Sequence, residues 1–245
     1  MSARLTNIKK LKAFSFEPGT IVSDKYQIIN LLGRGWEGEV YLIRELSTGI
    51  ERTAKFFFPE RNLRDINLRS YARKLHKLRT CPIVIHYHTR ERVEIQGHKI
   101  SFLVSEYVEG ELLSNFLARQ PGKRLNAFAA THLLYALATG LRCVHGLGEY
   151  HGDLHTDNII VQRFGLEFEL KLLDMFYRGS ARKEYIQDDL IDLIQVYFEA
   201  LGGSKHYARQ PDAVKYICCG RRRGLILKKF RSVRHLCHHL ETMHM

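Results

Sequence analysis

Alternating hydrophobic and polar positions predict that the first half of the chain is rich in β-strands. Five segments show this alternation or a high content of β-branched and aromatic residues, and glycine-containing or polar turns separate them. A basic segment with apolar residues on one face, residues 61–79, predicts a single helix among them. The expected strands are residues 26–34, 39–46, 51–58, 83–89 and 100–107.

After Gly110 the apolar residues recur at intervals of three and four, which predicts helices. Asn126 is the expected N-cap of a long buried helix. Residues 159–162 and 168–174 predict a short hairpin around Gly165, and residues 189–201 predict a second apolar helix. The tail from Pro211 is basic and is expected to be helical.

These patterns together predict an α+β fold with two lobes. We expect an N-terminal basic extension over residues 1–25 and a lobe with a small antiparallel sheet and one helix over residues 26–107. A mostly helical lobe should follow over residues 108–245.

Composition indicates a globular chain with a positive surface. Of the 245 residues, 45% are apolar and 26% are charged, which excludes a disordered or collagenous protein. The 38 Lys and Arg exceed the 26 Asp and Glu by 12, so a polyanion is expected among the partners. Nucleotide phosphate, nucleic acid and an anionic membrane surface all fit this charge.

The cysteines and the apolar segments favour a cytoplasmic protein. The five cysteines are an odd number and include no C-x-x-C pair, so reduced thiols are expected. No apolar run follows the basic N-terminal residues, which argues against a secretory signal. The most apolar stretch, residues 127–144, is interrupted by Thr131, His132 and Arg142, so no transmembrane segment is expected.

A glycine string between the first two predicted strands is the first candidate for phosphate binding. Gly33, Gly35 and Gly38 have the G-x-G-x-x-G spacing, which alone is weak evidence. A dinucleotide-binding fingerprint would open a helix, whereas residues 39–43 continue as a strand. The string is therefore interpreted as a flap over phosphates, with an ordinary hairpin turn as the alternative.

Lys55 is the second candidate, because it lies in the third predicted strand between Ala54 and Phe56. A lysine that points inward needs an anion nearby. Nucleotide phosphate would supply that anion. An ordinary surface lysine is the alternative interpretation.

The string His-Gly-Asp-Leu-His-Thr-Asp-Asn over residues 151–158 carries the strongest signal. Asp153 lies five residues before Asn158, and Asp174 follows after one predicted hairpin. Their spacing should bring three oxygen-bearing side chains together. Mg²⁺ prefers such oxygen ligands, and one carboxylate, one amide and phosphate oxygens suffice to hold it.

These strings resemble the protein-kinase-like superfamily over residues 26–203. The resemblance implies a two-lobed kinase fold that binds ATP and Mg²⁺ and moves the γ-phosphoryl to a hydroxyl acceptor, either a protein Ser/Thr or a small molecule or glycan. It also implies a role for individual residues of the sheet lobe. The glycine flap would be Gly33, Gly35 and Gly38, the phosphate-holding lysine Lys55, the adenine ceiling Val40 and Ala54, the hinge Glu106 and Val108, and the gatekeeper Ser105.

In the helical lobe the resemblance gives Asp153 the place of the aspartate that accepts or orients the acceptor hydroxyl. Asn158 and Asp174 match the metal ligands, and Asp189 matches the residue that braces the catalytic loop from behind. The loop reads His-Gly-Asp-Leu-His, a wording that resembles sugar, antibiotic and lipopolysaccharide kinases. His155 would replace the usual catalytic lysine beside the γ-phosphate.

Three departures from the family pattern keep an alternative open. The helix over residues 61–79 has no clear glutamate to pair with Lys55, since Glu60 and Asp65 both come early. Asp174-Met175-Phe176 stands where Asp-Phe-Gly is usual, and only 14 residues separate Asp174 from Asp189. The alternative is a pseudokinase that binds nucleotide or acts as a scaffold without phosphoryl transfer.

The basic C-terminal run is a candidate binding surface of its own. An acidic partner such as RNA, DNA or acidic lipid is compatible with it, and so is a solvated basic face. The solvated face is favoured because no nucleic-acid module accompanies the run. The cysteine and histidines near the C-terminus show no regular zinc-ligand spacing. The run comprises Arg221, Arg222, Arg223, Lys228, Lys229, Arg231 and Arg234.

Overall fold

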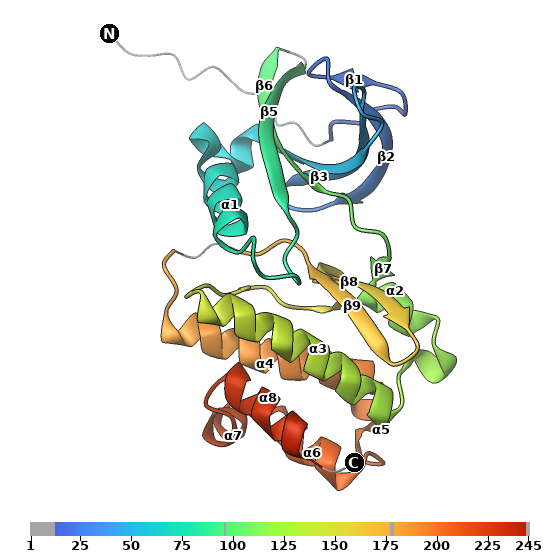
Figure 1. Cartoon of the computed structure of the whole chain (residues 1–245), viewed down its shortest axis with the longest axis vertical. Coiled ribbons are helices and arrows are strands. Elements are labelled where there is room, and N and C mark those ends of the chain that lie inside the picture. Colours follow the sequence, from blue (N-terminus) through green and yellow to red (C-terminus); the bar gives the residue numbers. More distant parts are fainter. Residues whose placement is uncertain (1–12, 96, 177–178, 244–245) are drawn as a thin grey trace. The chain divides into compact units, whose positions relative to one another are not determined.

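The computed structural model describes residues 13–95, 97–176 and 179–243, which form two compact units (Figure 1). The first unit comprises the described residues up to Arg73 together with His86–Tyr107. The second comprises Lys74–Ile85 and the chain from Val108 onward. A sheet unit and a mostly helical unit confirm the predicted α+β class. The segment Lys74–Ile85 differs from the expected boundaries, because it packs with the helical unit.

The first unit contains an antiparallel sheet of six strands in the order β1-β2-β3-β4-β6-β5, which curls strongly (Figure 1). Four of the predicted strands are present within a few residues of their expected ends. The fifth begins later than expected, because Ile83 O accepts a hydrogen bond from Leu172 N in the second unit. The bounds are β1 Ile21–Val22, β2 Tyr26–Arg34, β3 Gly38–Glu45, β4 Glu51–Phe57, β5 Tyr87–Ile95 and β6 His98–Glu106.

One face of this sheet forms an aromatic core to which the residues before β1 contribute. The Phe56 and Phe102 rings stack with centroids 4.4 Å apart. Phe14 stacks on Phe58 at 5.1 Å, and Phe16 lies 4.9 Å from Phe56. The expected extension is therefore part of the sheet unit from residue 13 onward. Residues 1–12 of that predicted segment lie outside the described residues.

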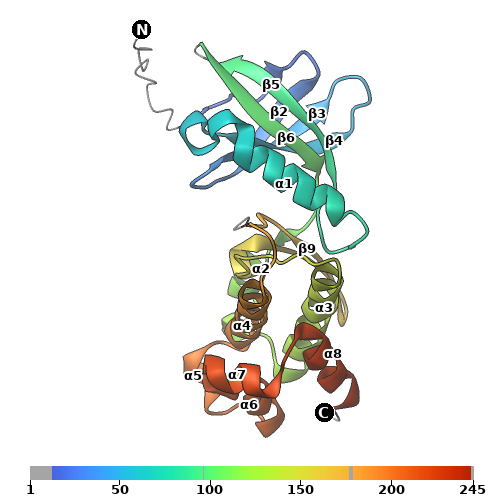
Figure 2. The same cartoon turned by 90° about the vertical axis from the view of Figure 1, so that its left-hand side faces the viewer.

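Helix α1 (Ile66–Lys77) is shorter than the predicted helix and lies beside the sheet (Figure 2). Two 3-10 turns, Pro59–Arg61 and Leu63–Asp65, precede it. Arg64 and Asp65 both have positive φ, which a right-handed helix cannot include. The helix therefore begins at Ile66 and not at Arg61.

The second unit packs its helices around a three-stranded antiparallel sheet, β7-β8-β9. Asn126 caps α3 as predicted, because its side chain accepts a hydrogen bond from Ala129 N at 2.8 Å. Figure 2 shows α3 and α4 beside each other, with α6, α7 and α8 beyond them. The bounds are β7 Glu111–Leu112, α2 Leu113–Ala118, α3 Ala127–Gly146, β8 Ile159–Phe164, β9 Glu167–Leu172, α4 Lys183–Ala200, α5 Ser204–Tyr207, α6 Asp212–Cys218, α7 Arg223–Lys229 and α8 Val233–Thr242.

Among the described residues, α3 is the one helix whose length and composition would allow it to cross a membrane. The sequence-based expectation was that Thr131, His132 and Arg142 make this segment too polar to span a membrane. The helix is nevertheless apolar enough by composition. Half of its apolar window is buried within the fold. It contacts α4, α8 and β9, as the core helix of a folded domain does.

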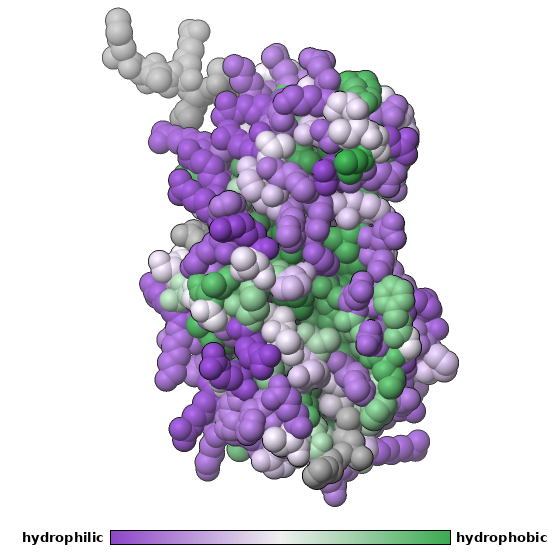
Figure 3. Space-filling view, in the orientation of Figure 1, coloured by the Kyte–Doolittle hydropathy of each residue, from purple (hydrophilic) through white to green (hydrophobic). Residues whose placement is uncertain are grey.

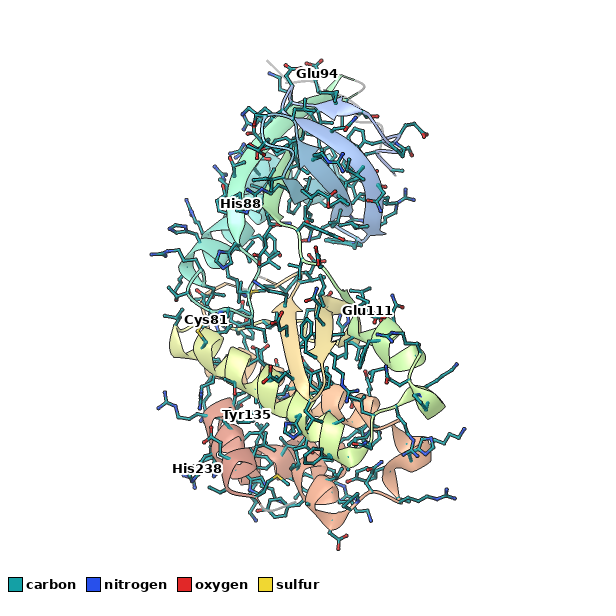
Figure 4. The ribbon with its side chains drawn as sticks, turned by 45° about the vertical axis from the view of Figure 1, so that its right-hand side comes forward. Cys81, His88, Glu94, Glu111, Tyr135 and His238 are labelled. Atoms are coloured by element: carbon teal, nitrogen blue, oxygen red, sulfur yellow. A yellow bond between two sulfur atoms is a disulfide. The ribbon has the colours of Figure 1, made fainter. Side chains whose placement is uncertain are left out.

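The expectation of reduced cysteines is wrong for one pair. Cys81 and Cys143 form a disulfide, with their Cα atoms 5.7 Å apart. Figure 4 labels Cys81 beside α3, the helix that carries Cys143. The pairing was not visible in the sequence because the two cysteines lie 62 positions apart. The free cysteines are Cys218, Cys219 and Cys237.

Candidate active site

The three glycines of the predicted flap differ in what their positions demand. A Cβ added to Gly38 would lie 1.8 Å from the carbonyl oxygen of Phe56, so this position requires glycine for packing alone. Gly33 and Gly35 have open space around them. The loop between β2 and β3 is closed by Gly35 N, which donates to Gly38 O at 2.9 Å. It is thus a strand-turn-strand loop, as predicted.

Lys55 has a carboxylate partner, and that partner comes from this loop. Lys55 Nζ lies 3.0 Å from Glu37 Oε2, and the lysine side chain is 12% exposed. The rings of Phe57 and Tyr71 flank the amine at 5.4 and 5.3 Å. The sequence pointed to an anion near an inward lysine, but it did not identify Glu37.

Two acids, Glu60 and Asp65, precede α1 in the sequence. Asp65 binds Arg90 and Arg92, with Arg92 at 3.2 Å. Burial by itself would raise the pKa of Asp65, but a hydrogen bond with Ser101 and the two arginines lower it. One oxygen of Glu60 is buried without a hydrogen-bond partner.

The two residues predicted for the adenine ceiling lie on opposite faces of the sheet. Val40 pairs with Lys55 across β3 and β4, so both side chains point to one face. Ala54 precedes Lys55 directly and therefore points to the other face, where it is buried in the aromatic core. The placement of Ala54 beside Val40 and Lys55 is corrected accordingly.

Thr53 is the residue that the sequence analysis missed. It lies two positions before Lys55 and pairs with Ser105 of β6, so it shares the face of Val40 and Lys55. Counting the strand alternation back from Lys55 would have found it. The predicted hinge residue Glu106 ends β6 in the first unit, with its backbone N–H bound to His86 O at 2.9 Å, and Val108 begins the second unit.

In the second unit, Asp189 of α4 holds the loop that carries the predicted catalytic residues. Its side chain is fully buried. It accepts hydrogen bonds from His151 N at 2.7 Å and from Gly152 N at 2.8 Å, and His145 Nε2 lies 2.8 Å away. Burial alone would raise the pKa of Asp189, but His145 and the loop amides lower it by more, so the carboxylate stays ionised.

The backbone of this loop explains its unusual glycine. Gly152 has φ of 86°, and a Cβ there would meet the Tyr150 ring at 2.9 Å. His151 is buried beside it. Its Nδ1 accepts from Asp153 N at 3.2 Å, so its Nε2 carries the proton and donates to Leu173 O at 2.9 Å. Burial lowers the pKa of His151, which favours this neutral form.

The structure brings Asp153, His155 and Asn158 together. Asn158 Nδ2 lies 2.9 Å from both Asp153 O and His155 Nε2, and 3.4 Å from Asp153 Oδ2. His155 Nε2 is 3.7 Å from Asp153 Oδ2. Because these contacts use the amide nitrogen of Asn158, they leave its oxygen, the atom that a cation needs, for another partner.

Asp174 lies near Asn158 through the β8-β9 hairpin. Ile159 pairs with Leu172, and Leu173 N donates to Asn158 O at 2.9 Å, so Asn158 and Asp174 emerge at the same end of the hairpin. An amide oxygen and a carboxylate are donors that Mg²⁺ accepts. No group of three or more His, Cys, Asp or Glu that would hold a metal on its own occurs in the described part of the chain.

The residues after Asp174 are tied to the same loop. Phe176 N donates to His151 O at 2.8 Å, and Phe176 O accepts from Lys74 Nζ at 2.7 Å. Lys74 lies 4.0 Å above the Tyr150 ring, and burial lowers its pKa to about 8. The backbone of Asp174 is left-handed, with φ of 49°.

Comparisons with known proteins agree with this architecture. The family model described as "Protein kinase domain" matches residues 26–207. Cyclin-dependent kinase B2-2 of Arabidopsis thaliana is 25% identical over 80% of this chain and 64% of its own length. CBL-interacting serine/threonine-protein kinase 13 of the same plant is 30% identical over 60% of this chain and 28% of its own length. The chain thus spans less than two thirds of these curated relatives.

A solved structure gives the same picture of the fold. A double-mutant form of the PknI kinase domain of Mycobacterium tuberculosis aligns with a TM-score of 0.69 and 19% identity. The alignment covers 93% of this chain and 98% of that domain. At this identity the likeness concerns the fold alone.

Proposed function

Because the chain belongs to the protein kinase family, we propose that it moves the γ-phosphoryl of ATP to a hydroxyl group with the help of Mg²⁺. The observation that carries this proposal is the loop in which Asp153, His155 and Asn158 contact one another while Asp189 holds its backbone. A catalytic loop that is held in place before substrate arrives reduces the barrier by positioning.

Asp153 is the group that accepts or orients the proton of the acceptor hydroxyl. Its side chain is 57% exposed, so an acceptor can reach it, and Asn158 lies against it. A carboxylate in this role contributes about 10²–10⁴-fold to a rate. His155, within the same cluster, stands where the family has a lysine and would interact with the transferring phosphoryl group.

Asn158 and Asp174 are the residues that would hold Mg²⁺. Their donor set fits the ion, because an amide oxygen and a carboxylate lie at the same end of the β8-β9 hairpin. When bound, the ion supplies charge neutralisation for the phosphates. The protein would contribute the Asp174 carboxylate and the Asn158 side-chain oxygen.

In the sheet unit, Lys55 and the glycine loop would bind the phosphates of ATP, and the face carrying Val40 and Thr53 would cover its base. Glu106 and Val108 would offer backbone groups to the adenine edge. Val40, Thr53 and Lys55 support this role because they share one face of the sheet.

The acceptor is a protein Ser/Thr or a small molecule or glycan. The curated relatives named as serine/threonine-protein kinases favour the protein acceptor. The His-Gly-Asp wording of the loop favours the small molecule or glycan. Screening transfer from labelled ATP across proteins, sugars and lipids decides between them.

The experiment that tests the proposed function replaces Asp153 by Ala. Turnover of ATP should fall by about 10²–10⁴-fold, while binding of ATP with Mg²⁺, measured by thermal shift, should persist. Asp157→Ala is the matched control, because Asp157 is an exposed carboxylate of the same loop. Unchanged turnover in Asp153→Ala would contradict the assignment of Asp153. A wild-type protein that binds ATP without consuming it, across the whole acceptor screen, would favour the pseudokinase alternative.

A further inference from the structure

Helix α1 offers no carboxylate to Lys55. Its sequence, INLRSYARKLHK, contains no Asp or Glu over Ile66–Lys77. The group that it does place near the lysine is the ring of Tyr71, 5.3 Å from Nζ. Any carboxylate that orients Lys55 within the sheet unit must therefore come from another element.

The glycine loop supplies that carboxylate at Glu37. The ion pair is partly buried, since the side chain of Lys55 is 12% exposed and that of Glu37 is 29% exposed. Such a pair is less screened by solvent than one on an open surface. A charge-assisted hydrogen bond of 3.0 Å at this place restricts where the amine can point.

The backbone of the loop is fixed so that Glu37 stays within reach. Phe58 N, just after β4, donates to Glu37 O at 2.9 Å. The preceding residue, Trp36, is 65% exposed, and the Arg61 guanidinium lies 4.0 Å above its ring. The tip of the loop is therefore held to the end of β4 and to the turn that follows it.

We propose that Glu37 is the positioning residue for Lys55. The glycine loop would then orient the same lysine with which it would bind the phosphates. This inference rests on the proposed function and names how its phosphate-binding residue is held. An ammonium group has three N–H donors, and one of them is directed at Glu37. The loop and the lysine then act as one unit, which accounts for a kinase helix without an acid.

The first test reads the pair without any nucleotide. Lys55 is acylated by an amine-reactive reagent, and the modified peptide is quantified by mass spectrometry in the wild type and in Glu37→Gln. Loss of a charge-assisted bond worth about 1.5–3 kcal/mol should speed acylation of Lys55 about tenfold or more. A purely structural role of Glu37 would change the unfolding temperature but not the relative reactivity of Lys55 in the folded protein.

Two matched controls separate Glu37 from other acids of the same unit. Glu60→Gln removes the acid in the first of the two turns before α1, and Glu51→Gln removes a surface partner of Arg44. Both should leave the acylation rate of Lys55 unchanged. A faster rate in Glu60→Gln with none in Glu37→Gln would overturn the proposal.

The second test measures the affinity for ATP with Mg²⁺. Glu37→Gln and Glu37→Ala should weaken binding about tenfold, because the lysine loses its orientation. Tighter binding in either variant would overturn the proposal, since it would mean that the carboxylate occupies the place of a phosphate. A wild-type protein that binds no ATP would refute the proposed function, while the acylation test would still decide whether Glu37 holds Lys55.

Discussion

Asp189 Oδ2 accepts a hydrogen bond of 2.7 Å from the backbone N–H of His151, although the two lie 38 positions apart in the sequence. Through this bond, helix α4 fixes the backbone at the start of the predicted catalytic loop. The Asp189 side chain has no solvent exposure, so water cannot replace it as an acceptor.

Replacing Asp189 by Ala should unfold or loosen the helical unit. The amides of His151 and Gly152 and the imidazole of His145 would lose their acceptor, at a cost of about 1–3 kcal/mol for each buried group. We expect a loss of about 3 kcal/mol or more in the free energy of unfolding, measured with urea. Asp212→Ala, at a fully exposed carboxylate, is the control. Equal stability of the two variants would contradict the bracing role of Asp189.

The buried imidazole of His151 should make the folded protein less stable in mild acid. Burial lowers its pKa in the folded protein, whereas the unfolded chain has the ordinary value of about 6.5. Below that pH the unfolded chain binds a proton that the folded protein does not, so stability is full above pH 6.5 and falls as the pH drops below it. The effect of this one group is at most about 1.4 kcal/mol per pH unit.

The measurement is the free energy of unfolding at pH 8, 6.5 and 5.5 in the wild type and in His151→Asn. The variant should lose less stability between pH 6.5 and 5.5, because it has no imidazole to protonate. All other groups are common to the two proteins, so their contributions cancel in the comparison. Identical slopes would show that His151 does not contribute.

Two glycines of the loop between β2 and β3 should differ in how much the packing of the sheet depends on them. Gly38→Ala should displace β3 from β4 and lower the unfolding temperature, because its Cβ would overlap the Phe56 carbonyl. Gly35→Ala has room for its Cβ and should leave the unfolding temperature unchanged. Thermal unfolding of both variants checks this. A large loss in Gly35→Ala with none in Gly38→Ala would contradict the loop conformation.

The disulfide predicts how many thiols the purified protein offers. Denaturation without reductant should allow alkylation of three of the five cysteines, and all five should react after reduction. The joint replacement of Cys81 and Cys143 by Ala should cost about 4 kcal/mol, since the bond closes a loop of 62 residues. Cys219→Ser, at a free cysteine, is the control for stability. Five reactive thiols before reduction would contradict the pairing.

The grouping of the candidate site residues in the helical unit could be predicted from short motifs because each motif acts locally. Asp153 and Asn158 lie five residues apart in one loop, and Asp174 follows a single hairpin, so spacing alone brought them together. The Asn126 cap is equally local. Ala54 shows the limit, since a family motif shifted by one residue places a side chain on the wrong face of a strand.

Contacts between distant segments lay beyond the sequence. Phe14 joins the aromatic core 42 residues from Phe56, and its backbone N–H donates to the buried Glu39 carboxylate at 3.1 Å. A phenylalanine or a glutamate in the sequence does not indicate which distant residue it will contact. The acidic partner expected for the basic tail stays a prediction, although hydrophilic residues cover the visible surface over α8 (Figure 3).

The order of hydrophobic and polar residues by itself determined which segments became strands and helices, because periodicity of two or 3.6 selects them locally. The loop with Asp153 and Asn158 could also be predicted, because the two residues are close in the sequence. Only the tertiary structure decided that Glu37 meets Lys55, that Cys81 meets Cys143 and that α1 starts after two turns. Those outcomes depend on which surfaces pack together, and a side chain that can bind several partners is assigned one only when the chain has folded.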